Sequence, residues 1–94
     1  MLVGLIGAGI QRSLSPALHE EEARHHGLRL HYQLIDLSVG GAGVDDLPRL
    51  LASVRQTGFA GVNITHPCKQ AVVPLLHALS THAHHIGAVK TVVF

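Results

Sequence analysis

The sequence predicts an α/β domain with an open, mainly parallel, twisted sheet and helices on both faces, in a three-layer α/β/α arrangement. Two observations favour this class. Short apolar, β-rich segments alternate with longer segments that begin and end at residues suited to helix termini. This spacing fits right-handed βαβ units, which join parallel strands. The last strand is expected to run either parallel or antiparallel to its neighbours.

Four apolar segments are expected to form the sheet: Met1 to Ile6, Leu30 to Leu37, Phe59 to Ile64 and Val89 to Phe94. Gly7 and Gly9 close the first of them with a strand-to-loop turn. In the second segment, the alternation of a strand places Tyr32 and Leu34 on one face. Residues 38–43, rich in glycine, are expected to form a loop.

Three segments are expected to be helical: Ser15 to just before Gly27, Asp45 or Asp46 to near Gly58, and about Pro67 to His85 with a break near Pro74 or Ser80. Ser15 suits the N-cap of the first helix, and Pro16 suits its first helical position. Gly27 suits the residue that stops it. A chain of 94 residues fits a single domain better than two, so one domain over 1–94 is expected.

The composition excludes several classes of protein. Hydrophobic residues make up 47% of the chain, and seven Lys and Arg stand against six Asp and Glu with no basic run, so nucleic-acid binding is not expected. No apolar run approaches the roughly 18 residues of a membrane span, and no signal peptide is indicated. The single cysteine, Cys68, fits a reducing compartment. These features predict a cytoplasmic protein without a membrane anchor.

Gly7 and Gly9, followed by Asp36 at the end of the next strand, match half of a dinucleotide-binding fingerprint. The full fingerprint needs a third glycine three residues after Gly9, where this chain has Arg12. Pro16 also delays the start of the helix. A plain strand-to-loop turn is therefore the preferred interpretation, and nucleotide binding by this segment is the weaker alternative.

Short polar side chains gather in two segments that follow strands one and three, residues 12–16 and 63–69. Ligands of open α/β sheets bind beyond the carboxyl ends of the strands, where both segments are expected. Polar and apolar residues alternate in each, so the polar groups share one side of an extended segment. Hydroxyls, a carboxamide and an ammonium together suit a small, polyhydroxylated, anionic ligand.

Three motifs, taken in order, resemble the shikimate dehydrogenase family. They are Ser-x-Ser-Pro-x-x-His from Ser13 to His19, Phe-x-Gly-x-Asn-x-Thr-x-Pro-x-Lys from Phe59 to Lys69, and Ile-Gly-Ala-Val-x-Thr-Val-Val from Ile86 to Val93. The resemblance implies that Ser13 and Ser15 hold the substrate carboxylate. It implies that Asn63 and Thr65 contact the ring substituents and the backbone around the pocket, and that Lys69 is the catalytic lysine.

The resemblance also implies parts that this chain lacks. The family's catalytic aspartate lies beyond residue 94, and NADP or NAD is bound by a C-terminal domain, so no cofactor is expected on this fragment. The ligand would be shikimate or quinate, and a homodimer is left open. Lys90 stands where the family usually has an asparagine that contacts a ring hydroxyl, so Lys90 is assigned to substrate binding and the preference between the two acids stays open.

Simpler interpretations stand beside these assignments. Ser15 also suits a plain helix N-cap, and Asn63 and Thr65 suit a turn. A metal site is one interpretation of the closely spaced His82, His84 and His85. A metal needs three or four convergent ligands, so we favour a solvated helix end for these histidines. Cys68 is interpreted as a spacer. A non-catalytic small-molecule sensor with the same fold is the alternative function.

Overall fold

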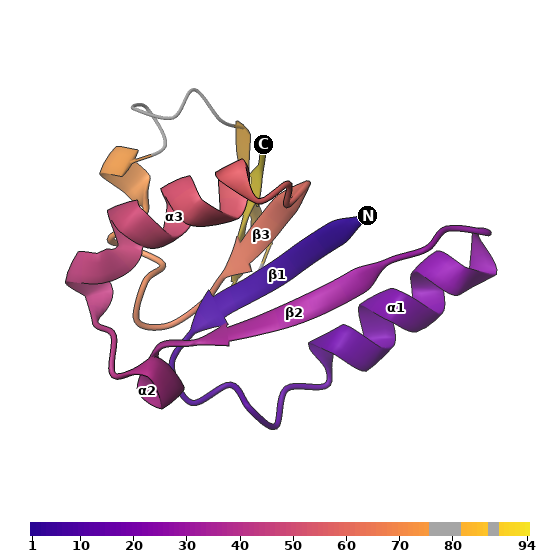
Figure 1. The fold of residues 1–94 in the computed structure, drawn as a ribbon, viewed down its shortest axis with the longest axis horizontal. Helices are drawn as coiled ribbons and strands as arrows, with labels where there is room; N and C mark the ends of the chain where they lie inside the picture. The colour runs from indigo at the N-terminus through magenta and orange to yellow at the C-terminus, as the bar shows by residue number, and fades with distance from the viewer. Residues whose placement is uncertain (76–81, 87–88) are drawn as a thin grey trace.

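The computed structural model describes residues 1–75, 82–86 and 89–94 of the chain. Their strands form one five-stranded sheet in the order β2-β1-β3-β5-β4 (Figure 1). The bounds are β1 Leu2–Gly7, β2 His31–Asp36, β3 Gly61–Ile64, β4 His82–Ile86 and β5 Val89–Val93. The four predicted strands are all present, and β4 is an additional one.

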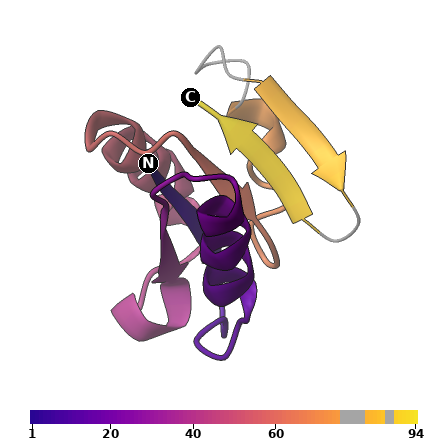
Figure 2. The ribbon, with the colours of Figure 1, turned by 90° about the vertical axis from the view of Figure 1, so that its right-hand side faces the viewer.

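Parallel pairing joins the first three strands, since β1 pairs in parallel with β2 on one side and with β3 on the other. On the far side of β3 the direction reverses, because β5 runs antiparallel to both β3 and β4 (Figure 2). The predicted open, mainly parallel sheet is therefore confirmed. Of the two orientations left open for the last strand, the antiparallel one is correct.

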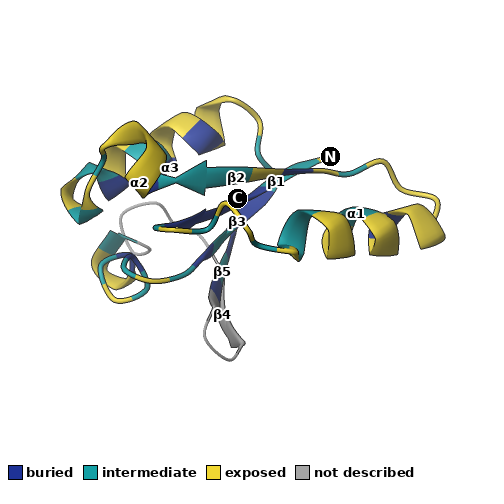
Figure 3. Cartoon of the chain, turned by 90° about the horizontal axis from the view of Figure 1, so that it is seen from below, coloured by how far each residue is buried: buried dark blue, intermediate teal, exposed yellow. Residues whose placement is uncertain are grey.

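Helices lie on both faces of the sheet, as the sequence predicts. Helix α1 (Ser15–His25) lies on one face, while α2 (Leu37–Gly40) and α3 (Leu47–Gln56) lie on the other (Figure 3). A short 3-10 turn, Val44–Asp46, leads into α3. Within the described residues, none of the helices has the length and apolar character needed to cross a membrane.

The core lies between α3 and the sheet. Leu47, Leu51 and Val54 recur at the spacing of one helical face and are all buried. They pack with buried residues of three strands and of the segment after β3, namely Ile6, Val62, Ile64, Val92, Cys68 and Val72. Because side chains alternate along a strand, Asn63, the polar residue of β3, lies on the opposite face.

Glycine is required where β3 meets β5. A Cβ atom added to Gly61 would lie 2.7 Å from the carbonyl oxygen of Val92, closer than real Cβ contacts. Gly61 is the glycine of the Phe-x-Gly-x-Asn motif, and its role here is to let the two strands pair.

The prediction of a helix from Pro67 to His85 is wrong in part. Turns and a bend occupy residues 66–72, helical backbone is present at 73–75, and His82–Ile86 form β4. The remainder, 76–81, lies outside the described residues. Pairing with β5 satisfies the backbone of β4, from His82 opposite Val93 to Ile86 opposite Val89. Such pairing is a tertiary constraint that overrides a local helical pattern.

Two helix boundaries differ from expectation, and a third has the predicted residue without the predicted hydrogen bond. The N-cap of α1 is Leu14 rather than Ser15, and the predicted loop after β2 begins as the short helix α2, with Asp36 accepting from the backbone N–H of Ser38. Asp46 is the N-cap of α3, one of the two predicted residues, but its carboxylate accepts from the N–H of Gly43 instead of capping the helix. The predicted stop at Gly27 is confirmed, with a positive φ of 71°.

Leu51→Ala is expected to lower the free energy of unfolding by about 2–5 kcal/mol, because a fully buried leucine leaves a cavity when truncated. Leu18→Ala is the matched control, since Leu18 lies on α1 and is 65% exposed. The control is expected to change stability by less than about 0.5 kcal/mol. Urea unfolding of both variants measures the difference. Equal effects would contradict the position of the core.

Candidate functional site

The loops that follow β1 and β3 lie side by side. The N–H of Thr65 donates to the carbonyl of Ile6 at 3.0 Å, and the N–H of Ala8 donates to the carbonyl of His66 at 3.0 Å. A Cβ atom on Gly7 would collide with the methyl group of Thr65, so glycine permits this approach. The two loops that carry the predicted polar segments therefore begin side by side at the carboxyl edge of the sheet.

Most of the predicted site residues are half-buried. Residues 62–65 alternate between buried and half-buried, with Val62 and Ile64 in the core and the polar side chains between them half-buried. The half-buried predicted residues are Ser13, Ser15, Asn63, Thr65 and Lys69. A half-buried polar group is partly shielded from water and still accessible to a ligand.

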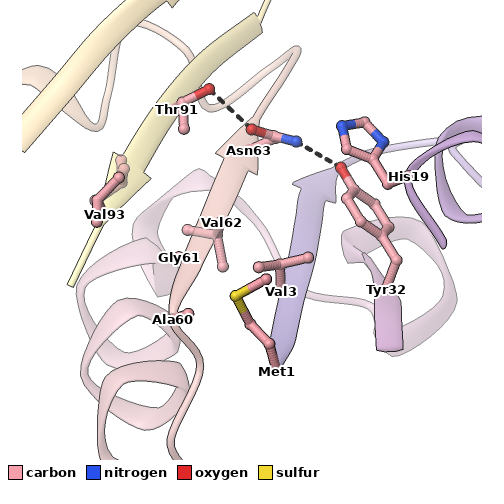
Figure 4. Close-up of a pocket in the computed structure, with 11 residues that line it drawn as sticks. Met1, Val3, His19, Tyr32, Ala60, Gly61, Val62, Asn63, Thr91 and Val93 are labelled. Carbon is pink, nitrogen blue, oxygen red and sulfur yellow. Dashed lines mark hydrogen bonds between the residues drawn. The ribbon is translucent and has the colours of Figure 1, made fainter. Parts of the chain in front are cut away.

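Asn63 is held by a side chain on each side of it. Its Nδ2 donates to the hydroxyl oxygen of Tyr32 at 2.6 Å, and its Oδ1 accepts from the hydroxyl of Thr91 at 2.9 Å (Figure 4). These three residues come from β3, β2 and β5. The carboxamide is therefore oriented, with its oxygen towards Thr91 and its nitrogen towards Tyr32.

Tyr32 joins this network to α1. Its side chain is only 3% exposed, and burial raises its pKa, although hydrogen bonds from Asn63 and Ser15 act in the opposite direction. The ring of His19 stacks on the Tyr32 ring, with centroids 4.6 Å apart (Figure 4). Nδ1 of His19 lies 2.9 Å from the carbonyl oxygen of Ser15, so that nitrogen carries the proton and Nε2 of a neutral ring is an acceptor.

A pocket of about 380 Å³ lies against this network. Its polar side chains come from His19, Tyr32, Asn63 and Thr91, and the remaining lining is apolar or backbone, from Met1, Val3, Ala60, Gly61, Val62, Val92 and Val93. Figure 4 shows the polar groups at one end and the apolar side chains at the other. The volume is within the usual range for small-molecule sites.

A second hollow, of about 330 Å³, contains the lysine that the family resemblance marks as catalytic. Thr65, His66, Pro67, Lys69 and Gln70 line it. Thr65 follows Asn63 by two residues, so the side chains of both lie on the same side of an extended segment. The structure thus places Lys69 on the loop that directly continues from the Asn63 network.

The two serines are organised by a local hydrogen bond. The backbone N–H of Ser15 donates to Oγ of Ser13 at 3.1 Å, while the N–H of Ser13 donates to the carbonyl of Ile10 at 2.9 Å. Because Oγ of Ser13 accepts a hydrogen bond, its own proton points elsewhere. A hydroxyl in this state is a donor, which suits the carboxylate of a ligand.

Lys90 is placed differently from the other predicted residues. It is 2% exposed, and it lies opposite Ile64 in the register of β3 and β5. Thr91, the next residue of β5, contacts Asn63, so the alternation of a strand directs Lys90 to the opposite face. The structure joins Ser15 to Asn63 through Tyr32 and places Thr65 with Lys69, but it leaves Lys90 outside both groups.

The histidines suspected of metal binding do not form a helix end, since His82, His84 and His85 belong to β4. Their side chains lie outside what the structure describes. In the described part of the chain, no group of three or more His, Cys, Asp or Glu could hold a metal ion. Cys68 is fully buried, and burial raises the pKa of its thiol, which disfavours the reactive thiolate.

Sequence reasoning missed three residues of this site: His19, Tyr32 and Thr91. Two of them had a signal, because His19 closes the first motif and Thr91 belongs to the third. Tyr32 is the single tyrosine of the chain, but it lies outside all three motifs. Its part in the site depends on the pairing of β1 with β2, which local patterns do not specify.

Comparisons with known proteins identify the family of the chain. Residues 5–92 match the family described as shikimate dehydrogenase substrate binding domain. A shikimate dehydrogenase (NADP(+)) of Streptomyces avermitilis is 56% identical over 93 residues, which are 99% of this chain and 32% of that protein. The chain therefore belongs to the family of shikimate dehydrogenase substrate-binding domains, and it spans about a third of the length of this relative.

Solved structures show the same fold. The quinate dehydrogenase from Corynebacterium glutamicum in complex with NAD superposes with a TM-score of 0.71 and 44% identity, covering 80% of this chain and 27% of that one. The shikimate 5-dehydrogenase from Thermus thermophilus in complex with shikimate gives a TM-score of 0.69 and 32% identity, with 80% and 27% coverage.

The phenol of Tyr32 is expected to ionise above its ordinary pKa of 10.0, because burial disfavours the phenolate. The folded chain then holds this proton more tightly than the unfolded chain. The resulting stability is present below the ordinary pKa and is lost as the pH rises above it. Tyrosinate absorbance measures the titration, with Tyr32→Phe subtracted as the control. A pKa at or below the ordinary value would contradict the buried network.

Proposed function

We propose that this domain binds shikimate or quinate and supplies the proton-transfer group for oxidation of a ring hydroxyl. The observation that carries the proposal is the hydrogen-bonded set of Ser15, Tyr32 and Asn63, which lies beside the loop that holds Lys69. Its donors and acceptors suit a polyhydroxylated acid. The names of the relatives, which include both shikimate and quinate dehydrogenases, support the same substrate class.

Ser13 and Ser15 are proposed to bind the carboxylate of the substrate. Both residues lie at the start of α1, where the helix dipole favours a negative charge. Oγ of Ser13 accepts from the amide of Ser15, so the hydroxyl proton of Ser13 can be donated to a carboxylate. Asn63 and Thr65, on one side of the following segment, are proposed to contact the ring substituents.

Lys69 is proposed to exchange a proton with the hydroxyl that becomes a ketone. Oxidation of a secondary alcohol removes a hydride from carbon and a proton from oxygen, and a bound NADP or NAD accepts the hydride. A lysine in reach of the oxygen can take the proton or stabilise the alkoxide. Lys69 is half-buried in its hollow, which shields this exchange in part from water.

The nicotinamide cofactor is proposed to be bound by another part of a longer chain. In this domain, the half-fingerprint formed by Gly7, Gly9 and Asp36 does not fit a dinucleotide. The carboxylate that would hold a ribose hydroxyl already accepts backbone N–H groups of Gly9, Ile10 and Ser38. The carboxylate of Asp36 therefore stabilises the loop after β1 and is not available to a ribose.

Lys69→Ala, in the intact chain, is expected to lower kcat by about 10²–10⁴-fold and to leave KM for the acid within a few-fold, because a proton-transfer group acts mainly in the transition state. Arg49→Ala on the exposed side of α3 is the control cation and should leave both constants unchanged. Steady-state kinetics on shikimate and quinate measure the effect. Normal turnover by Lys69→Ala would refute the proton-transfer role.

Replacing Ser13 and Ser15 together with alanine is expected to raise KM for the acid at least ten-fold, since a hydrogen bond to a charged group contributes about 1.5–3 kcal/mol. The KM for the nicotinamide cofactor should stay within about two-fold, because the serines are proposed to contact only the acid. An unchanged KM for the acid would show that the serines serve only the local turn.

Lys90→Asn is expected to keep turnover and to alter the preference between shikimate and quinate, because the family resemblance assigns this position to a contact with a ring hydroxyl. A site built to bond a hydroxyl discriminates against analogues that leave its groups unpaired. The ratio of kcat/KM on the two acids is the measurement. An unchanged ratio would agree with the buried position of Lys90 on the opposite face of β5 and would remove it from the substrate site.

A further inference from the structure

We propose that Asp36, at the end of β2, is a positioning residue that holds Ser13 and Ser15 in the geometry needed for the carboxylate of the substrate. The inference deepens the proposed function and rests on it. Asp36 is in none of the three family motifs. Its role follows from its hydrogen bonds to a loop that lies 27 residues earlier in the chain.

The carboxylate of Asp36 gathers three backbone amides. Oδ1 accepts from the N–H of Gly9 at 3.0 Å and from the N–H of Ser38 at 2.9 Å, and Oδ2 accepts from the N–H of Ile10 at 2.9 Å. The first and third of these bonds fix two consecutive residues of the loop after β1. Gly9 adopts a positive φ of 68°, which lets both amides point to the same carboxylate.

Hydrogen bonds connect Ile10 directly to the serines. The carbonyl of Ile10 accepts from the N–H of Ser13 at 2.9 Å, and Oγ of Ser13 then accepts from the N–H of Ser15 at 3.1 Å. Each hydrogen bond fixes the residue that makes the next one. Asp36 is thus connected through hydrogen bonds to the hydroxyl of Ser13 and to the backbone N–H of Ser15.

A negative carboxylate suits this position better than a neutral side chain. Burial opposes the charge of Asp36, but the N–H groups of Gly9, Ser38 and Ile10 and the side chain of Gln11 outweigh it and hold the pKa below its ordinary value. An asparagine of the same shape would turn one NH₂ group towards a backbone donor. That end of the loop would lose its acceptor.

The interpretation also accounts for the acidic residue of the incomplete dinucleotide fingerprint. In a nucleotide-binding domain, such a carboxylate bonds the hydroxyls of a ribose. Here both oxygens of Asp36 already accept from the backbone. The same strand–turn arrangement therefore organises a loop that carries serines.

Asp36→Asn in the intact chain is the main test, and Asp46→Asn is the matched control. Asp46 also accepts a loop amide, from Gly43 at 2.8 Å, but it lies before α3. Asp36→Asn is expected to raise KM for the acid about ten-fold and to leave kcat within about two-fold, because the serines bind the ground state and the transition state alike. Asp46→Asn is expected to leave both constants within about two-fold.

Three further measurements test whether Asp36 acts through the loop that carries the serines. In a background of Ser13→Ala and Ser15→Ala, Asp36→Asn should change KM by less than about two-fold, because residues that act through one another are not additive. Hydrogen exchange of a peptide covering residues 8–14 should become faster in Asp36→Asn and stay unchanged in Asp46→Asn. Asp36→Glu keeps the charge and should raise KM by less than Asp36→Asn does.

The outcomes separate this inference from the function on which it rests. If the wild-type chain oxidises neither shikimate nor quinate, the proposed function fails, and this inference fails with it. If the wild type turns over and neither Asp36 variant raises KM, the inference alone is overturned. It is also overturned if the Asp36 and serine effects add fully, or if exchange of the loop does not change.

Discussion

Two strands far apart in the sequence, β1 and β3, pair in parallel, and the position of the candidate site follows from that pairing. It brings the loop with the serines beside the loop with Thr65 and Lys69. Hydrogen bonds continue the pairing past the ends of both strands, from Thr65 to Ile6 and from Ala8 to His66. Gly7 is required at this junction because a side chain there would collide with Thr65.

The two faces of the sheet carry different side chains: one contributes to the aliphatic core and the other to the polar network. On one face, α3 buries Val62 and Ile64 in the aliphatic core. On the other, Asn63 bonds Tyr32 and Thr91, and His19 stacks on Tyr32. Because side chains alternate along a strand, a single short segment of β3 serves both the core and the polar network. A shift of register by one residue would exchange the two sets and destroy both.

Charge is used sparingly around the proposed carboxylate site. In the described residues, the loop that carries the serines is held largely by hydrogen bonds between neutral groups. The carboxylate of Asp36 is the charged group among them, and it accepts from the backbone of this loop. Hydroxyls and amides can bind an anion without the large desolvation penalty of a buried cation. Lys69, the residue proposed to exchange a proton, lies in the hollow formed by the loop after β3.

The sequence by itself determined the fold class, the four principal strands, the two loops at the carboxyl edge and the stop at Gly27, because hydrophobic period, glycine and proline act locally. It also singled out Ser13, Ser15, Asn63, Thr65 and Lys69 by their types and spacing. Only the tertiary structure decided that His82–Ile86 form a strand and that Tyr32 and Thr91 hold Asn63. It also decided that Lys90 lies on the face of β5 opposite Thr91, and that Asp36 holds the loop of the serines. Each of these depends on partners that lie far along the chain or in a neighbouring strand, and a local pattern carries no information about which strands become neighbours.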